Sequence, residues 1–154
     1  MVDELSQAPH ERLVDGIALH MEAAGGVDRA AVPLGMLLAW LTNLNLLTPA
    51  FAQQHAAAIV RLKYRELKGS ELLVSACGGE LYWADLTSQG EAFLRDFYPT
   101  YLDQFVATFK GDPYGVEDSW DNYDQISRVL TAALMGPAKS AQKKSSKKKW
   151  WSFW

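Results

Sequence analysis

Residues 30–47, AAVPLGMLLAWLTNLNLL, are the most apolar stretch of the chain and decide its fold. The stretch is interrupted by polar residues and falls short of the ~20 apolar residues that a membrane-spanning helix needs. A helix that is apolar on so many sides is usually central to a domain. We therefore predict a buried core helix, with Pro33 in its first turn because proline lacks an amide hydrogen. Its leucine stripe consists of Leu34, Leu37, Leu38, Leu41 and Leu44.

The segments around this stretch also favour helices. Glu11–Ala24 has apolar residues at helical spacing and is followed by a glycine pair. Thr48-Pro49 is a cap followed by a first-turn proline, which indicates another helix start. Ser70 is placed to cap a short helix that Gly78-Gly79 ends in left-handed backbone. Residues Glu80–Trp83 are predicted to form a short extended or turn segment.

The second half of the chain is rich in aromatic residues. Ser88–Glu91 has capping-box spacing, which predicts a helix start. The apolar face that follows either packs in the core or forms a partner-binding groove, and Pro99 must kink or divide its helix. A polar loop, Gly111–Asp118, leads to a last helix of about Asp121–Met135. The apolar face consists of Phe93, Leu94, Phe97, Tyr98, Tyr101, Leu102, Phe105, Val106 and Phe109.

These segments predict a mainly α protein, a compact single-domain bundle of five to six helices. The bundle occupies residues 1–136, with at most a short β segment near 80–83. A chain of 154 residues is long enough for one hydrophobic core. Residues 137–154 are rich in alanine, serine and lysine, a composition that predicts a flexible, disordered tail.

The net charge of −3 conceals an uneven distribution. Six of the 15 basic side chains are lysines between Lys139 and Lys149, where there is no acidic residue. The other nine stand against all 18 acidic side chains, so residues 1–136 carry a net charge of −9. Such a body does not suit nucleic-acid binding, which depends on Lys and Arg neutralising phosphates. It suits a cationic protein partner, because complementary charge speeds encounter.

The compartment is predicted from the cysteine content and the N-terminus. The single cysteine, Cys77, cannot form an internal disulfide, so the fold does not need an oxidising compartment. The first residues, MVDEL, are acidic where a secretory signal is basic. We expect a cytoplasmic protein, with the option of peripheral attachment to the inner face of the membrane through the tail.

Several runs of sequence between about residues 28 and 106 stand out together: Ala30–Trp40 with Leu46-Leu47, Gly69–Leu73, Ala76–Leu81, and Asp85–Thr87 followed by Gly90 and Phe93. These runs resemble an uncharacterised family of small bacterial single-domain proteins. The resemblance implies a mostly helical fold and a bacterial host, and small proteins of this type resemble immunity proteins encoded beside secreted toxins. Two departures are Pro33, where a polar residue is expected, and the longer helical segment at the N-terminus.

Residues for catalysis are sparse. His10, His20 and His55 are far apart and have no zinc-binding spacing, so each is expected at the surface or half-buried on a helix. Cys77 would lie at the C-terminal end of a helix, where the dipole opposes a thiolate, and burial is the better interpretation. There is no phosphate-binding loop and no nucleophile-elbow motif. We predict no catalytic residues, no cofactor and no enzymatic activity.

Acidic residues gather around the start of the last helix. Their spacing is not that of an EF-hand loop, so we predict no metal site. Asp121 or Ser119 as the helix cap, with Asp124 near the helix N-terminus, explains part of the cluster. The remaining charge suits a protein partner, and the predicted partner-binding residues are Glu117, Asp118, Asp121 and Asp124.

Two classes of function remain. The first is a non-catalytic binding protein, a bacterial immunity protein that neutralises a cognate toxin by direct binding through an acidic surface. The alternative is a peripheral membrane-surface or adaptor protein that acts through its tail. Lysines near an anionic surface contribute about 1 kcal/mol each, and Trp and Phe partition to the headgroup level. The tail residues concerned are Lys143, Lys144, Lys147, Lys148, Lys149, Trp150, Trp151, Phe153 and Trp154.

Overall fold

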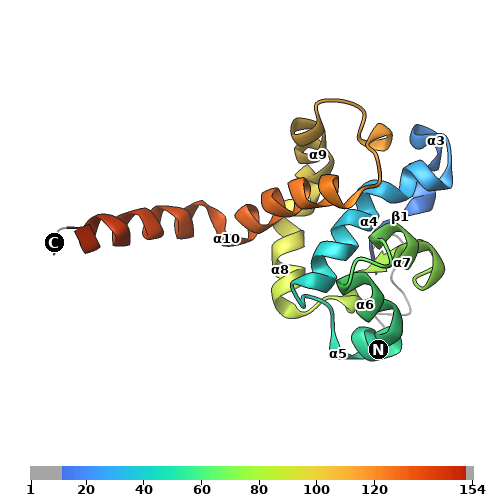
Figure 1. The fold of residues 1–154 in the computed structure, drawn as a ribbon, viewed down its shortest axis with the longest axis horizontal. Coiled ribbons are helices and arrows are strands. Elements are labelled where there is room, and N and C mark those ends of the chain that lie inside the picture. Colours follow the sequence, from blue (N-terminus) through green and yellow to red (C-terminus); the bar gives the residue numbers. More distant parts are fainter. Residues whose placement is uncertain (1–11, 152–154) are drawn as a thin grey trace.

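The computed structural model describes the backbone of residues 12–151 and the side chains of residues 12–136. The fold is mainly α, with one small antiparallel sheet of two strands in the described part. Figure 1 shows helix α4 in the middle of the body, with α6 and α7 on one side and α8 and α9 on the other. The predicted helical bundle with a short β segment is therefore confirmed.

Helix α4 spans Val27–Asn43, and every residue from Ala30 to Thr42 is buried. This confirms the predicted core helix. Pro33 lies inside the helix, so its predicted place in the first turn is wrong. Proline cannot donate to the carbonyl of Arg29 one turn earlier, yet the tertiary contacts of α4 outweigh that loss. One such contact is made by the Tyr101 hydroxyl, which donates to the Pro33 carbonyl at 2.6 Å.

Helix α7 spans Gly69–Ser75 and crosses α4 in very close contact. A Cβ atom on Gly69 would lie 1.9 Å from the Gly35 carbonyl oxygen. A Cβ atom on Gly35 would lie 2.5 Å from the Ser70 amide nitrogen. The two glycines therefore let the helix backbones touch. The predicted Ser70 cap is wrong, because the helix begins at Gly69 and its cap is Lys68, two residues earlier; the Glu71 carboxylate accepts the Lys68 amide at 2.9 Å.

The N-terminal part of the body differs from its prediction. Instead of one helix there are strand β1 (Leu13–Gly16), 3₁₀-helix η1 (Ile17–His20) and α3 (Met21–Ala24). Strand β1 pairs antiparallel with β2 (Glu80–Tyr82), the extended segment that was expected. Pairing with a distant segment outweighs the local helical spacing.

The next helices confirm one predicted cap and shift another. Helix α5 (Pro49–Gln54) is capped by Thr48, whose hydroxyl accepts the Phe51 amide at 3.2 Å. Helix α6 (Ala56–Lys63) follows after a break at residue 55. After 3₁₀-helix η2 (Trp83–Asp85), α8 (Ser88–Phe97) is capped by Thr87 rather than Ser88. The Gly90 amide donates to the Thr87 hydroxyl at 3.1 Å, so the cap lies one residue earlier than predicted.

The aromatic segment is divided at Pro99, one of the two predicted outcomes. A 3₁₀-helix η3 (Tyr98–Thr100) separates α8 from α9 (Tyr101–Phe109). Tyr101 and Phe105 are fully buried, which supports core packing for this face. Another 3₁₀-helix, η4 (Pro113–Gly115), lies in the polar loop before the last helix.

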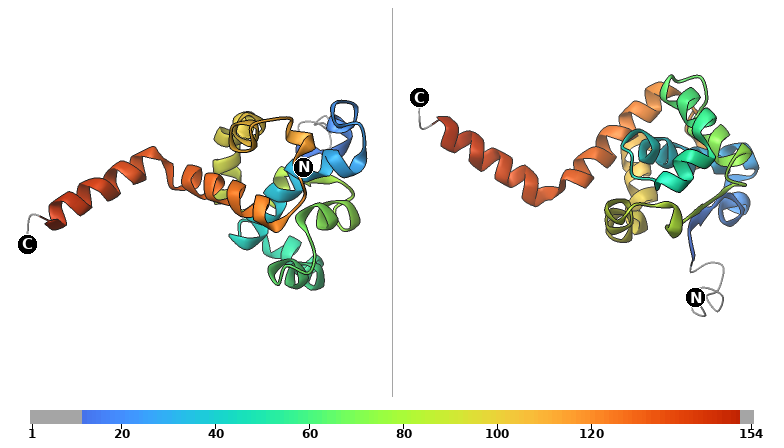
Figure 2. Two further views of the ribbon diagram at one scale, coloured as in Figure 1. Left: turned by 45° about the horizontal axis from the view of Figure 1, so that its top comes forward. Right: turned by 90° about the horizontal axis from the view of Figure 1, so that it is seen from below.

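Helix α10 is continuous from Trp120 to Trp151 except at Gly136, where the backbone is not helical (φ 74, ψ 154). Figures 1 and 2 show the ribbon turning there. The backbone after Gly136 is helical to residue 151, and alanine, lysine and glutamine are good helix formers. Side chains from 137 onward lie outside the described residues, so flexibility of the tail stays a prediction. Within the described residues no helix is long and apolar enough to cross a membrane.

Candidate functional site

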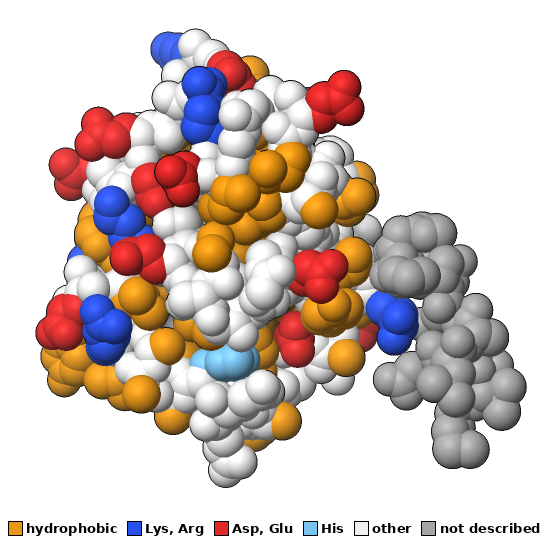
Figure 3. All heavy atoms as spheres, turned by 90° about the vertical axis from the view of Figure 1, so that its right-hand side faces the viewer, with side chains coloured by type: hydrophobic (Ala, Val, Ile, Leu, Met, Phe, Trp, Pro, Cys, Tyr) orange, Lys and Arg blue, Asp and Glu red, His pale blue; other side chains and the backbone are white. Residues whose placement is uncertain are grey.

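A groove with a volume of about 960 Å³ lies between the start of α4, helix α7 and the loop that contains η4. Two of its apolar side chains stay well exposed, Val27 at 43% and Val74 at 46%. Figure 3 shows exposed hydrophobic side chains among acidic and basic ones on the face that carries α7. The charged residues that line the groove are Asp28, Arg29, Arg61, Lys68, Glu71 and Asp118.

The basic side chain of Arg29 holds one wall of the groove in place. Its Nε donates to the Tyr114 carbonyl at 2.9 Å, and its Nη2 contacts the Asp112 carboxylate at 3.2 Å. Asp112 also accepts the Tyr114 amide at 2.9 Å. The η4 loop is therefore anchored to the first turns of α4, and part of the positive charge in the groove is already neutralised.

The four predicted partner-binding acids have different surroundings. Asp118 lines the groove and accepts the Ser70 hydroxyl at 2.5 Å. Asp124 on α10 forms a bidentate ion pair with Arg65, whose Nη2 and Nη1 lie 2.6 and 3.2 Å from the carboxylate oxygens. This pair lowers the pKa of the Asp124 carboxyl group. The side chains of Glu117 and Asp121 are exposed and make no hydrogen bond or ion pair within residues 12–136. Those two carboxylates are therefore the ones most open to a partner.

Ser119 is the cap of α10, one of the two candidates from the sequence. Its hydroxyl accepts the Asn122 amide at 3.1 Å. The helix start is further fixed by Arg65, whose guanidinium lies 4.9 Å from the centre of the Trp120 ring. The acidic cluster thus has a structural part, Asp118 and Asp124, and an exposed part. Within residues 12–136 no three His, Cys, Asp or Glu side chains are grouped so that they would hold a metal ion.

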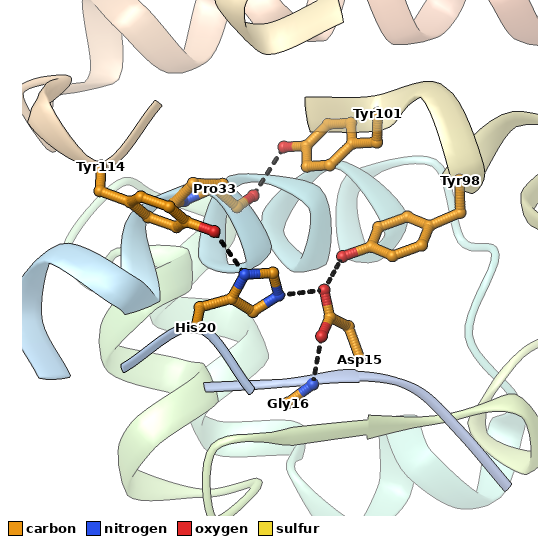
Figure 4. A network of polar contacts seen from close by, with 7 residues as sticks. All are labelled: Asp15, Gly16, His20, Pro33, Tyr98, Tyr101 and Tyr114. Carbon is orange, nitrogen blue, oxygen red and sulfur yellow. Dashed lines mark hydrogen bonds and ion pairs between the residues drawn. The ribbon is translucent and has the colours of Figure 1, made fainter. Parts of the chain in front are cut away.

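A buried polar cluster lies behind the groove and was not predicted from the sequence (Figure 4). The Asp15 carboxylate accepts the Gly16 amide at 2.8 Å and the Tyr98 hydroxyl, and it contacts His20 Nε2 at 2.6 Å. His20 Nδ1 lies 2.5 Å from the Tyr114 hydroxyl. Asp15, His20, Tyr98 and Tyr114 form what we call the Asp15 cluster. It joins the adjacent elements β1 and η1 to η3 and η4, which lie far along the chain: Tyr98 is 83 residues from Asp15 and Tyr114 is 94 residues from His20.

The order carboxylate, imidazole and hydroxyl in the Asp15 cluster is also that of a catalytic triad, in which the imidazole takes the hydroxyl proton and the carboxylate orients the imidazole. Two observations favour a structural role instead. The space between these residues leaves no room for a water molecule. Burial, followed by the charges of Asp15 and Asp112, raises the pKa of Tyr114, so its phenol stays protonated at neutral pH and is a poor nucleophile. The cluster therefore ties the η4 loop to the core.

The other candidate nucleophile, Cys77, is half-buried after α7. Burial, with a smaller effect of the Asp85 charge, raises the pKa of its thiol to about 11. A thiol with this pKa is almost entirely protonated at neutral pH. This agrees with the sequence interpretation of Cys77 as a packing residue. His55 packs its ring against Phe51 with the ring centres 4.6 Å apart, and His10 lies outside the described residues.

The chain belongs to a family described as "Domain of unknown function (DUF7832)", whose model matches residues 14–117. This confirms the resemblance to an uncharacterised family. The matched range includes the Asp15 cluster and nearly all of the groove, and it stops before α10 and the tail. No curated protein matches the chain, and no solved structure matches it.

Proposed function

We propose that the protein is a non-catalytic binding protein of immunity type, which neutralises a cognate secreted toxin by covering it. The observation that carries this proposal is the open groove with exposed valines beside carboxylates that have no partner within the described residues. Such a combination is typical of a protein-binding surface, where apolar area contributes affinity and charge contributes association rate. The acidic body, with its net charge of −9 over residues 1–136, supports a cationic partner.

The proposed binding surface consists of the groove together with Glu117 and Asp121 at the start of α10. Asp118 connects the two parts, because it lines the groove and follows Glu117 directly. Asp124 contributes less than the sequence suggested, since Arg65 already neutralises it. A candidate partner is the variable C-terminal domain of a large secreted protein encoded beside this chain.

The first prediction is that the double variant Glu117→Lys/Asp121→Lys associates about tenfold more slowly with this partner at low salt. Neither carboxylate makes a hydrogen bond or ion pair within the described residues, so the fold should be retained. The lysine in the first turn of α10 should cost only about 0.3–1 kcal/mol through the helix dipole. The difference should shrink as salt is raised, because screening shortens the range of the field. Stopped-flow or surface-binding kinetics at several salt concentrations measure both effects.

The matched control is Asp96→Lys/Asp103→Lys. These acids are also exposed, lie on α8 and α9 away from the groove, and change the net charge equally. If both double variants slow association to the same degree, only net charge matters and the proposed surface is wrong. If neither has an effect at any salt concentration, an acidic surface plays no part in binding.

The alternative function, attachment to a membrane surface, is supported by the sequence of the tail. Six lysines and four aromatic residues occur in residues 139–154. The second prediction is that the full-length chain co-sediments with anionic vesicles at low salt, while replacing the tail aromatics with alanine weakens pelleting although every lysine remains. Neutral vesicles are the control. Equal pelleting with anionic and neutral vesicles, or none with either, would remove this alternative.

A further inference from the structure

The chemistry of the groove suits an occupant that is both apolar and cationic. Its valines are exposed, and the acids Asp28, Glu71 and Asp118 line it. Three basic residues line it too: Arg29 is paired with Asp112, while Arg61 and Lys68 form no ion pair within the described residues. Glu117, next to Asp118, adds a fourth carboxylate against these two cations, so the groove with its edge is net acidic. Nothing within the described residues covers this surface.

The chain itself contains a segment with the complementary chemistry. Residues 143–154, KKSSKKKWWSFW, combine five lysines with three tryptophans and one phenylalanine. Aromatic side chains bury large apolar areas, and lysines pair with an acidic rim. The same chain therefore supplies both the acidic groove and a segment that fits it.

The segment can reach the groove of its own chain. Helix α10 begins two residues after Asp118, and Gly136 interrupts it. The 17 residues from Trp120 to Gly136 cover about 26 Å as a helix. Residues 137–149 cover up to about 43 Å when extended, which is enough to return. Unwinding the helix after Gly136 costs little free energy, because lysines four residues apart repel each other in a helix and short isolated helices are marginal in water.

We propose that residues 143–154 fold back and occupy the groove of the same chain, with the tail aromatics against the apolar wall and the lysines at the acidic rim. The tail then competes with any protein that binds there, so the groove is autoinhibited. The competition rests on the proposed function, whereas the docking itself does not. Because the tail is tethered, its effective concentration is about 1 mM, and even a weak contact is well occupied.

Hydrogen–deuterium exchange of the full-length protein tests the docking without any partner. We take the intrinsic dissociation constant of the tail for the groove as about 0.1 mM. The comparison protein is a full-length variant with all four tail aromatics replaced by alanine. Backbone amides of residues 68–75 and 112–118 should then exchange about tenfold more slowly in the parent than in this variant. The amides of α8 serve as an internal reference and should not change. Equal exchange at the groove in the two proteins would overturn the proposal.

A second variant tests the groove side. Val74→Lys places a positive charge at an exposed position in the groove and should remove the protection as fully as the tail variant does. Val106→Lys on α9, similarly exposed at 40%, is the control and should retain it. Protection that grows with protein concentration would show a second copy as the occupant and overturn docking within one chain. If the docking proposal fails, the prediction that charge reversal slows association can still hold, so the two proposals fail separately.

Discussion

Replacing Gly69 with alanine should remove about 3 kcal/mol or more of the free energy of unfolding. The new Cβ atom would lie 1.9 Å from the Gly35 carbonyl oxygen and 2.9 Å from the Ala39 Cβ. The first neighbour is backbone inside the central helix, so α7 must move as a whole to relieve the overlap. Alanine is the better helix former by about 1 kcal/mol. Overpacking of a tight core costs about 1–3 kcal/mol or more and outweighs that gain.

Chemical denaturation of the two proteins measures this difference. The control is Gly111→Ala, because a Cβ atom there meets nothing within 4 Å. Its free energy of unfolding should stay within about 0.5 kcal/mol of the parent, as for most surface changes. If Gly69→Ala is as stable as Gly111→Ala, the close crossing of α4 and α7 is not a feature of the folded protein.

The close crossing shows what the sequence could and could not predict about the fold. The burial of α4 follows from its composition, since a run that is apolar on all sides has no face for solvent. The sequence does not show which part of α7 contacts α4. Gly35 and Gly69 are ordinary helix-weakening residues in the sequence, and only the packed structure shows that they face each other.

The first segment was mispredicted for a related reason. The spacing of Leu13, Ile17 and Met21 fits a helix, but Leu13 pairs with Tyr82 in the sheet. The choice between strand and helix was therefore made by a segment about seventy residues away. Local patterns located the cap at Thr48 and missed two others by one or two residues. They cannot reveal which distant strand will pair with a segment.

The sequence predicted the negative charge of the candidate site but not the groove. The acidic loop could be recognised from sequence, and the structure places Asp118 from this loop in the groove. The exposed valines come from α4 and α7, and nothing in the sequence distinguishes them from core residues. The contacts of Asp15 and His20 could not be predicted either, because their partners Tyr98 and Tyr114 come from the second half of the chain.

Asp15→Ala should be the second most damaging substitution, with a cost of about 3–5 kcal/mol in the free energy of unfolding. The carboxylate is buried and accepts from three donors. Its removal leaves the Tyr98 hydroxyl, one His20 nitrogen and the Gly16 amide without partners, and each buried unsatisfied group costs about 1–3 kcal/mol. The total stays below their sum, because the exposed edge of His20 can reach water.

Tyr98→Phe separates the effect of the cluster from that of a single hydrogen bond. It removes one donor and leaves the Asp15 carboxylate with two others, so we expect a loss of only about 1 kcal/mol. The double variant should be less destabilised than the sum of the two single variants by about 0.5–3 kcal/mol, because both remove the same contact.

Asp103→Ala, an exposed acid on α9, controls for the loss of a negative charge and should be nearly neutral. Denaturation curves for the parent and the four variants provide these values. The loss of Asp15 should also free the η4 loop, since His20 then has no fixed orientation toward Tyr114, and the amides of residues 112–118 should exchange faster well below the unfolding transition. If Asp15→Ala costs no more than Tyr98→Phe and leaves this exchange unchanged, the cluster does not hold the wall of the groove, and the groove must be positioned by Arg29 and Asp112 alone.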